Sequence, residues 1–394
     1  MNLNELLSLG VEEIIVRKDL EKKLISGKKL RIKLGADPTK PDLHLGHAVV
    51  LRILKKFQEE GHTIIFVVGD YTVRIGDPSG RSKTRPALSE QEIEQNSKTY
   101  FDQVGKILDI KQIELKRNSE WCEKLSLAEL IKLMSNFTVA RILERDDFYN
   151  RYKKGTSIGL HEFLYPVMQA YDSLVLKADL EIGGSDQKFN MLAGRELQEK
   201  LGEKPQDVII CQILEGIDGH EKMSKSLNNY IGITEPPQDM YGKIMSISDK
   251  LIVKYYNLCT DYPAEKISQI EKRMKSKKLN PRDAKAELAK SIVKLYHNEE
   301  EAQKAAEEFD RIFKMKEMPE KISEIVLKLS SYSLPDLLIS MSLVVSKSEA
   351  KRLIGQGGVK IDGNVISNKE ADIKIKDGMV LQVGRRKFAK VKLE

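Results

Sequence analysis

The first 230 residues alternate short runs of β-branched residues with longer segments of helical spacing. Residues 30–34 and 63–68 have the composition of strands, and residues 48–60 between them have helical periodicity. This alternation is typical of a parallel sheet whose strands are joined by helices. Further strands are expected at 173–176, 181–183 and 208–211, and further helices at 162–171 and 189–200. We therefore predict one large α/β domain over residues 1–230.

The pattern changes after the Glu-Pro-Pro sequence at residues 235–237, where long helices rich in Lys, Glu and Ala begin. One helix start is well marked, because Asn280 is a preferred N-cap residue and Pro281 suits the first helical position. The apolar positions of this helix fall at Ala284, Leu288, Ile292 and Leu295. We predict a helical domain over residues 231–327.

A third unit is expected over residues 328–394. A short helix at residues 348–354 should end at Gly355. Two strand pairs should then turn at Asp362-Gly363 and at Asp377-Gly378, which are both hairpin signals. The pattern predicts a small α+β domain.

The composition is that of a globular protein. Hydrophobic residues make up 41% and charged residues 32% of the 394 positions, which excludes a mainly disordered chain. No apolar run approaches the roughly 20 residues that a membrane helix needs. Residues 1–23 have the pattern of an amphipathic helix and not of a secretion signal. Cys122, Cys211 and Cys259 are far apart and form no CxxC pair, so we expect reduced thiols and a cytoplasmic protein.

Positive charge is concentrated toward the C-terminal end. Residues 335–394 hold 12 Lys and Arg against 7 Asp and Glu, so this segment supplies +5 of the net charge of +7. Such a local excess is expected of a unit that contacts a phosphate backbone.

The densest chemical signal lies between the first strand and the first long helix, where GADPT at 35–39 is followed by DLHLGH at 42–47. His44 and His47 fall in the opening turn of the helix, where unpaired N–H groups and the helix dipole favour an anion. Gly46 lets a flat ring approach the backbone, so a nucleotide triphosphate is the expected ligand. A zinc pair or two helix-capping histidines are the alternatives. Zinc needs further ligands, and the other histidines and the cysteines do not cluster nearby.

A second signal is the sequence KMSKS at residues 222–226, preceded by GIDG at 216–219. Lys222 and Lys225 stand on a loop with glycine hinges, from which they would reach triphosphate oxygens and stabilise the charge on leaving pyrophosphate. The alternative for this segment alone is an ordinary solvated loop.

The third signal is a polar face on an otherwise apolar helix. Tyr165, Gln169 and Asp172 have the spacing that places them on one helical face, and their neighbours are apolar. A buried carboxylate and amide need hydrogen-bond partners, which a ligand with a hydroxyl and an ammonium group would supply. An internal network satisfied by the backbone is the alternative.

Together and in this order, HLGH and KMSKS resemble the two signature sequences of class I aminoacyl-tRNA synthetases, which activate an amino acid with ATP and transfer it to tRNA. With the third signal, GDPSGR at 76–81 and GGSDQKFN at 183–190, the whole chain resembles the bacterial tyrosine branch of that family, in its KMSKS form and not its KFGKT form. The resemblance implies a class I Rossmann-type catalytic domain at 1–230, a helical anticodon-binding domain at 231–327 and an S4-type RNA-binding domain at 328–394.

The same resemblance implies roles for the site residues. Transition-state stabilisation would fall to Thr39, His44, His47, Lys222 and Lys225. ATP would be bound by Gly46, Asp186 and Lys225. Tyrosine would be bound by Asp37, Asp77, Tyr165, Gln169, Asp172 and Gln187, with Asp172 accepting from the phenol. ATP would be a substrate carrying Mg²⁺ on its triphosphate, and no metal bound by the protein itself is expected.

The remaining expectations concern partners. The partners implied are tRNA(Tyr), tyrosine, ATP and a second copy of the chain in a homodimer, without a membrane. RNA contacts are expected at Arg81, Arg85, Lys351, Arg352 and Lys360, with Arg385, Arg386 and Lys387 as further candidates.

Two positions depart from the resemblance. Lys33 stands where many relatives have a tyrosine that contacts the phenol, which leaves the second partner of the phenol open. Leu34 replaces a cysteine that contacts ribose in some relatives.

Two rival functions remain. A non-catalytic RNA-binding descendant of a synthetase would have no need to keep both signatures. A tryptophan enzyme is disfavoured by an acceptor carboxylate suited to a phenol and by the S4-like tail.

Overall fold

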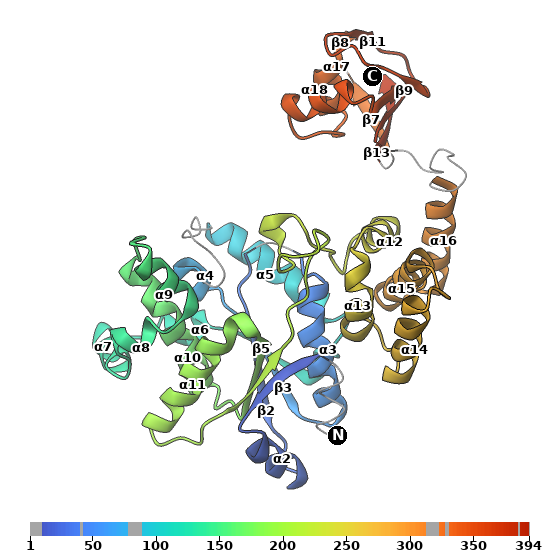
Figure 1. Cartoon of the computed structure of the whole chain (residues 1–394). Helices are drawn as coiled ribbons and strands as arrows, with labels where there is room; N and C mark the ends of the chain where they lie inside the picture. Colours follow the sequence, from blue (N-terminus) through green and yellow to red (C-terminus); the bar gives the residue numbers. More distant parts are fainter. Residues whose placement is uncertain are drawn as a thin grey trace. The chain divides into compact units, whose positions relative to one another are not determined.

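The structure is a computed structural model that describes residues 10–39, 42–77, 89–312, 323–327, 331–384 and 387–393. The chain forms two units, Met1–Asn298 and Glu299–Glu394, each of which is described by itself (Figure 1). The two boundaries drawn from the sequence between its three expected domains stay a prediction.

The first unit is built on a six-stranded sheet with the order β1-β6-β5-β2-β3-β4. Its strands are β1 (Val11–Ile15), β2 (Arg31–Ala36), β3 (Thr63–Val68), β4 (Ile113–Arg117), β5 (Leu180–Gly184) and β6 (Asp207–Cys211). Five strands are parallel, and β1 pairs antiparallel with β6 at the edge. β3 and β6 are mostly apolar and almost wholly buried, as expected of parallel strands covered on both faces. The α/β fold class predicted from the sequence is confirmed.

Helices cover both faces of this sheet. α10 (Leu164–Val175) and α11 (Lys188–Lys200) lie on one side, and α3 (Leu45–Glu59) lies on the other (Figure 1). Ile65 and Val67 of β3 share a buried cluster with α10 and α11. The other helices around the sheet are α2 (Arg17–Ile25), α4 (Thr72–Ile75), α5 (Glu90–Val104), α6 (Ser119–Cys122), α7 (Leu127–Met134), α8 (Val139–Ile142) and α9 (Asp146–Lys153). Short 3-10 turns are η1 (Ile110–Gln112), η2 (Leu160–Phe163), η3 (Ser185–Gln187), η4 (Lys225–Leu227) and η5 (Asp249–Leu251).

The predicted change to long helices is also present. The helices are α12 (Pro237–Met245), α13 (Ile252–Cys259), α14 (Ala264–Lys275) and α15 (Pro281–Tyr296). α15 begins as predicted, because the side chain of Asn280 accepts a hydrogen bond from the N–H of Arg282 and Pro281 is the first helical residue. Three of its four predicted apolar positions are buried. The fourth, Leu295, is 39% exposed, because the adjacent Tyr296 takes the buried place.

Two predictions of secondary structure are wrong. Residues 173–175 end α10 and Leu176 caps it, so no strand forms there. A short apolar run does not distinguish a strand from a buried helix, and this one packs against α11. Val11–Ile15 is strand β1 and not part of an N-terminal helix, because its residues pair with β6. Residues 1–9 lie outside the described residues.

The second unit begins with α16 (Glu299–Asp310) and continues into a small α+β fold. Its two sheets have the orders β10-β9-β12-β13-β7 and β11-β8. The strands are β7 (Ser323–Leu327), β8 (Ser331–Ser333), β9 (Val359–Ile361), β10 (Asn364–Val365), β11 (Asp372–Lys374), β12 (Val380–Val383) and β13 (Lys387–Leu393). α17 (Leu334–Ser340) and α18 (Lys347–Gly355) share a buried apolar core with these strands. The predicted helix near residues 348–354 is confirmed.

One of the two predicted hairpins is present. Asp362 and Gly363 have φ values of 47° and 83° and join the paired strands β9 and β10. The turn at Asp377-Gly378 does not join paired strands, because β11 pairs with β8 while β12 pairs with β9 and β13. The side chain of Asp377 accepts from the N–H of Leu393 on β13. A turn sequence indicates a change of direction but not which strand will be the partner.

Candidate active site

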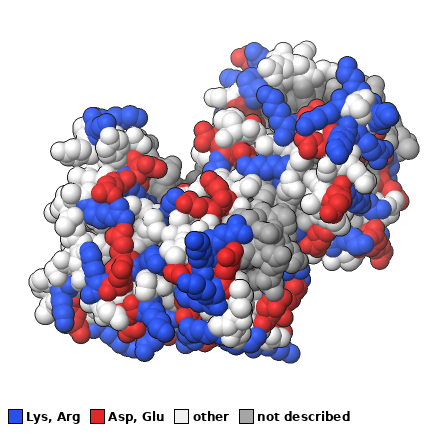
Figure 2. Space-filling view, turned by 60° about the horizontal axis from the view of Figure 1, so that its bottom comes forward, with Lys and Arg blue, Asp and Glu red and all other residues white. Residues whose placement is uncertain are grey.

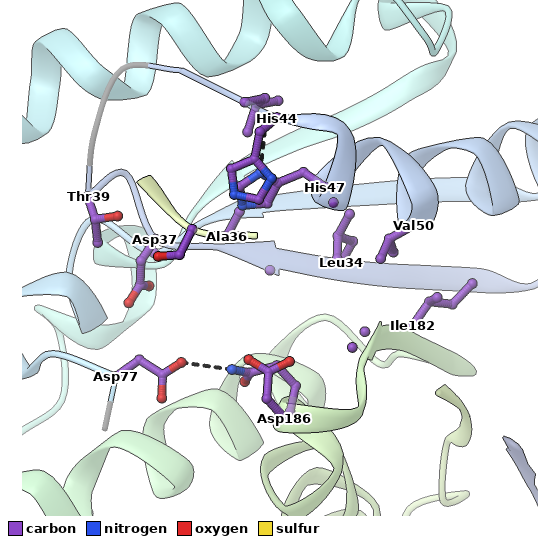
Figure 3. Close-up of a pocket in the computed structure, with 18 of the residues that line it drawn as sticks. Leu34, Ala36, Asp37, Thr39, His44, His47, Val50, Asp77, Ile182 and Asp186 are labelled. Atoms are coloured by element: carbon purple, nitrogen blue, oxygen red, sulfur yellow. Dashed lines mark hydrogen bonds between the residues drawn. The ribbon is translucent and has the colours of Figure 1, made fainter. Parts of the chain in front are cut away.

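A cavity of about 970 Å³ opens at the carboxyl ends of β2 and β5. β2 and β5 are neighbours in the sheet, and the strand order runs outward from them in opposite directions, to β3 beyond β2 and to β6 beyond β5. Open α/β sheets bind ligands at the point where the strand order reverses in this way. His44 and His47 lie on one side of it, and Asp77 and Asp186 lie on the other (Figure 3). The structure brings into this lining all residues that were expected to act on tyrosine and ATP: Asp37, Thr39, His44, Gly46, His47, Asp77, Tyr165, Gln169, Asp172, Asp186, Gln187, Lys222 and Lys225.

The two histidines stand at the start of α3, with His44 as N-cap and His47 as the third helical residue. The backbone N–H of His44 donates to Nδ1 of His47 (3.2 Å), and the ring centroids are 3.8 Å apart. His47 therefore caps the helix through one nitrogen, and its other ring nitrogen takes no part in this cap. Nδ1 of His44 is buried and has no hydrogen-bond partner among the described residues, as expected where a ligand supplies one.

Both imidazoles are neutral at physiological pH. Burial, assisted by the charges of Lys225 and Lys222, lowers the pKa of His44 to about 3. Burial also lowers the pKa of His47 well below its usual value, with His44 and the same lysines contributing. Positive potential in this half of the cavity therefore comes from the lysines and the helix N-terminus, while the imidazoles supply neutral hydrogen-bonding groups.

Gly46 lies where the two signature segments meet. A Cβ atom at this position would be 3.1 Å from Nδ1 of His44 and 3.7 Å from Cβ of Met223. A side chain at this position would therefore crowd the His44 ring and contact the KMSKS loop, defined as residues 222–226.

The lysines of the KMSKS loop are already engaged. Lys225 is only 8% exposed, and its Nζ donates to the hydroxyl of Tyr100 on α5 (2.9 Å). Lys222 forms an ion pair with Asp186. The interpretation of this segment as a solvated loop does not hold for Lys225.

Backbone and side-chain hydrogen bonds hold the loop beside α3. The N–H of Leu45 donates to the carbonyl oxygen of Ile231 just beyond the loop (2.9 Å). The side chain of Asn229 accepts from the N–H of Ser224 (2.7 Å) and donates to the carbonyl oxygen of Lys222 (3.2 Å). The two signatures, which are far apart in sequence, are thus linked through the segment of Asn229 and Ile231 that follows the loop.

The polar face of α10 points into the cavity as its spacing predicts. The hydroxyl of Tyr165 donates to Oδ2 of Asp37 (3.0 Å). The amide nitrogen of Gln169 donates to Oε1 of Glu181 on β5 (3.1 Å). The internal network considered as an alternative therefore exists, but it is made by side chains, and its members also line the cavity.

Asp172 is a buried carboxylate, 5% exposed. Its Oδ1 accepts from the indole N–H of Trp121 (2.8 Å) and its Oδ2 from the amide of Asn118 (3.4 Å). Burial raises the pKa of Asp172 to about 6, although Lys33 and these two donors oppose the shift. The group is therefore mainly anionic at neutral pH, and a carboxylate has acceptor sites beyond these two for a hydroxyl donor.

Lys33 is a buried cation behind the cavity wall, 1% exposed. Its Nζ lies 3.0 Å from Oε1 of Glu181 and donates to Oγ of Ser173 (2.6 Å) and to the carbonyl oxygen of Gln169 (3.1 Å). Lys33, which departs from the family resemblance, thus contacts two residues that line the cavity, Gln169 and Glu181, from outside the lining. Leu34 lines the cavity itself.

Asp77 lies on the side of the cavity opposite the histidines (Figure 3), and Gln187 is hydrogen-bonded to it there. The amide of Gln187 donates to Oδ2 of Asp77 (2.7 Å), and the guanidinium of Arg145 donates to Oδ1 of Asp77 (2.8 Å). The cavity therefore has the Asp77, Asp37 and Asp172 carboxylates at the end next to α10 and the lysines at the signature end.

Only some of the basic residues that were expected to contact RNA lie within the described residues. Lys351 and Arg352 are exposed on α18, and Lys360 is half-buried on β9. Lys and Arg are interspersed with Asp and Glu over the face shown in Figure 2. Four predicted residues lie outside the described residues: Arg81, Arg85, Arg385 and Arg386.

Several residues of this site were missed in the sequence: Asn118, Trp121, Arg145, Asn190 and Tyr100. Each acts on a predicted residue through a long-range hydrogen bond, so no local spacing connects them. Trp121 is the only tryptophan of the chain, and a buried acceptor such as Asp172 requires donors, but neither fact identifies the pair.

Comparison with protein families identifies the class. A model described as tRNA synthetases class I (W and Y) matches residues 26–314, and an S4 domain model matches residues 334–377. The first match covers more than half of the chain, which therefore belongs to the class I tRNA synthetases of the tryptophan and tyrosine family.

Within this family, similar relatives are tyrosine enzymes. Tyrosine–tRNA ligase of Thermotoga maritima is 49% identical over 387 residues, which are 98% of this chain and 96% of the relative. Tyrosine–tRNA ligase 2 of Clostridium acetobutylicum is 51% identical over 394 residues, 99% of this chain and 98% of the relative. The similarity spans almost the entire chain, and the tryptophan alternative is not favoured.

Solved structures show the same fold. Tyrosyl-tRNA synthetase of Archaeoglobus fulgidus, solved with L-tyrosine, matches with a TM-score of 0.61 and 24% identity over 78% of this chain and 100% of its own. The truncated mitochondrial enzyme of Coccidioides posadasii matches with a TM-score of 0.60 and 24% identity over 76% of this chain and 89% of its own. At these identities the likeness establishes the fold alone.

Proposed function

We propose that this chain activates tyrosine with ATP to give tyrosyl-adenylate and pyrophosphate, and then transfers the tyrosyl group to tRNA(Tyr). The observation that carries the proposal is the single cavity in which the buried Asp172 carboxylate and both signature segments meet. The proposal is also supported by the relatives described as tyrosine–tRNA ligases, which this chain matches over almost their full length.

The first step needs no nucleophile from the protein. A carboxylate oxygen of tyrosine attacks the α-phosphorus of ATP, and the bond between that phosphorus and the oxygen bridging to the β-phosphate breaks. The electron pair leaves with pyrophosphate. Because the attacking group is already an anion, positioning and stabilisation of the developing charge supply the rate.

The triphosphate would be held from two sides. His44 and His47 donate neutral hydrogen bonds from the N-terminus of α3, while Lys222 and Lys225 exchange Asp186 and Tyr100 for phosphate oxygens. The triphosphate carries more negative charge than Asp186 or Tyr100, so it can replace them as the partner of Lys222 and Lys225. Thr39, Gly46 and Asp186 line the same region, with Asp186 placed for the ribose once Lys222 has left it.

Tyrosine would occupy the other end of the cavity. Asp172 accepts from its phenol, and Asp37, Asp77, Tyr165, Gln169 and Gln187 surround the amino-acid end. An analogue without the hydroxyl would leave Asp172 buried with an unfilled acceptor site, which disfavours phenylalanine.

The residues at the nucleotide end fit a Mg²⁺ ion that arrives on ATP. Asp186 is paired with Lys222 before ATP binds, and once Lys222 has moved to the phosphates its proposed partner is the ribose. Mg²⁺ prefers phosphate oxygens and water over an all-protein cage, and when bound it would neutralise charge on the triphosphate.

In the second step the terminal ribose hydroxyl of tRNA attacks the tyrosyl carbonyl carbon and AMP leaves. The S4-like unit would assist through Lys351, Arg352 and Lys360, because cations that neutralise phosphates supply much of the affinity for RNA. Arg81 and Arg85 are proposed to contact the acceptor end of tRNA.

The working enzyme is proposed to be a cytoplasmic homodimer. On α7 and α8, Leu127, Ile131 and Val139 are exposed by 74%, 61% and 62%, which provides an apolar surface for a second copy. Among the described residues, the helices are all too short or too polar to cross a membrane. The cytoplasm is where ATP, tyrosine and tRNA are found together.

ATP–pyrophosphate exchange with each of the twenty amino acids tests the proposal. Exchange that depends on tyrosine is expected. Exchange supported best by another amino acid, or by none, would reject it and favour a different synthetase or a non-catalytic descendant.

A further inference from the structure

Arg145 is a buried guanidinium outside the wall that faces the proposed substrate. It is 4% exposed and stands immediately before α9. Its NH2 donates to Oδ1 of Asp77 (2.8 Å) and its NH1 to Oδ1 of Asn190 (3.1 Å). Its Nε lies 2.8 Å from Oδ1 of Asp147. One side chain thus connects the start of α9 with two other segments, those of Asp77 and Asn190.

Asn190 on α11 extends these contacts to both glutamines of the cavity. It is 1% exposed, and its amide nitrogen donates to Oε1 of Gln187 (2.9 Å) and to Oε1 of Gln169 (2.9 Å). Because Arg145 donates to its Oδ1, the Asn190 amide has one orientation, with both hydrogens directed at the glutamines.

The hydrogen bonds close into a ring. Arg145 contacts Asp77, Asp77 accepts from Gln187, Gln187 accepts from Asn190, and Asn190 accepts from Arg145. In a closed network each bond fixes the direction of the next, so removal of one member frees the others. Asp77, Gln187 and the attached Gln169 line the cavity, whereas Arg145 lines a second cavity of about 600 Å³.

The net charge of Arg145, Asp77 and Asp147 also suits a site for a cationic group. Arg145 is flanked by Asp77 and Asp147, so the three side chains together carry one net negative charge. One ammonium group would bring this charge to zero. Without Arg145 the two carboxylates would repel each other in a poorly solvated place, and Asp77 would lose its fixed direction.

We propose that Arg145 and Asn190 are positioning residues for recognition of the α-ammonium group of the amino-acid substrate, an inference that rests on the proposed function. They act through Asp77, Gln187 and Gln169, whose orientation they set before the substrate arrives. Affinity for a ligand with an ammonium group depends on this ring, while affinity for the rest of the ligand does not.

The test compares tyrosine with its desamino analogue, in which hydrogen replaces the ammonium group. Calorimetric Kd values for both ligands are measured with the full chain as wild type, Arg145→Met and Asn190→Leu. We expect each substitution to lower the ratio of the two affinities by about tenfold or more, as when one charge-assisted hydrogen bond is lost. Binding of the analogue should change little.

Arg151→Met is the matched control. Arg151 lies on α9, the helix that Arg145 immediately precedes, and is 7% exposed, but it pairs with Glu162 and the carbonyl oxygen of Ser157, outside the ring. Its replacement should leave the ratio of affinities unchanged, even if the protein becomes less stable.

The outcomes are distinct. If Arg145→Met weakens both ligands equally, or leaves the ratio as it is, the positioning role is wrong and Arg145 is merely structural. If Arg145→Met does not fold, Arg145→Lys and Asn190→Ser are measured with the same criterion. A wild-type protein that does not bind tyrosine would instead reject the proposed function itself.

Discussion

At the scale of single residues, the proposed selectivity depends on one carboxylate. Asp172 is held by Trp121 and Asn118, which have no freedom to follow a different ligand because they are buried as well. These donors orient the carboxylate without filling all of its acceptor sites. The remaining acceptor capacity suits the hydroxyl of a phenol.

Asp172→Asn should reduce the preference for tyrosine over phenylalanine by about 10- to 100-fold, because hydrogen bonds to charged groups contribute about 1.5–3 kcal/mol. The measurement is the ratio of kcat/KM values in ATP–pyrophosphate exchange. Asp70→Asn is the matched control, since Asp70 is a buried carboxylate that binds Ser119 and lies outside the cavity lining. An unchanged ratio in Asp172→Asn would contradict the placement of the phenol.

The pKa of Asp172 gives a pH prediction. Burial raises this pKa to about 6 from an ordinary value of 3.8, so the group favours the folded state at acid pH and opposes it as pH rises through about 6. Tyrosine, as a hydrogen-bond donor, binds the anionic form better. The KM for tyrosine should therefore rise as pH falls through about 6, and Asp172→Asn should abolish this rise. The same rise in both proteins would assign it to another group.

At the scale of elements, the start of α3 and the KMSKS loop act as one unit. Leu45 and Ile231 are joined through the backbone, and Gly46 lies close to Met223. A change of loop position during catalysis would therefore be transmitted to the helix end that is proposed to hold the phosphates.

Lys225→Ala should slow formation of tyrosyl-adenylate by about 100-fold or more, the usual effect of losing one group that stabilises transition-state charge. Tyrosine binding should be unaffected, because the lysine lies at the nucleotide end. Single-turnover rates and equilibrium binding of tyrosine separate the two effects. Lys204→Ala, at an exposed position before β6, is the control. Equal rates in the two variants would show that the loop is not a phosphate clamp.

The main elements were predictable from the sequence because their signals are local. The period of the apolar residues identified β3 and α11, and residue types at 280–281 identified the start of α15. The strand expected at 173–176 was wrong because a short apolar run has no period to measure. The pairing of β11 with β8 could not be predicted either, because it depends on tertiary contacts.

The candidate site could be predicted only in part. Its signatures and the face of α10 are motifs or spacings within one segment, so their members were found. The donors of Asp172 lie 51 and 54 residues away in sequence, at the end of β4, and they meet it only because β4 lies beside β3. Arg145 and Asn190 are likewise brought together by folding. Supporting residues of this kind have no sequence signal of their own.

At the scale of the whole molecule, the candidate active site and the S4 match lie in different units of the chain. The cavity lies entirely within Met1–Asn298, whereas the S4 match lies within Glu299–Glu394. The net charge of +5 over residues 335–394 belongs to the second of these units.

Removal of residues 330–394 should weaken tRNA binding strongly and leave tyrosyl-adenylate formation nearly unchanged. The lost cations supply a salt-dependent part of the affinity, so the dependence of Kd on salt should also become shallower. Filter binding at several salt concentrations and pyrophosphate exchange measure the two activities. Equal losses in both would contradict an independent RNA-binding unit.

The most direct test of the account is a crystal structure with tyrosine and a non-hydrolysable ATP analogue. The phenol oxygen is expected within hydrogen-bond distance of Asp172, and the triphosphate is expected between the His44–His47 pair and Lys225. A nucleotide bound elsewhere, or an amino acid whose side chain points away from Asp172, would contradict it.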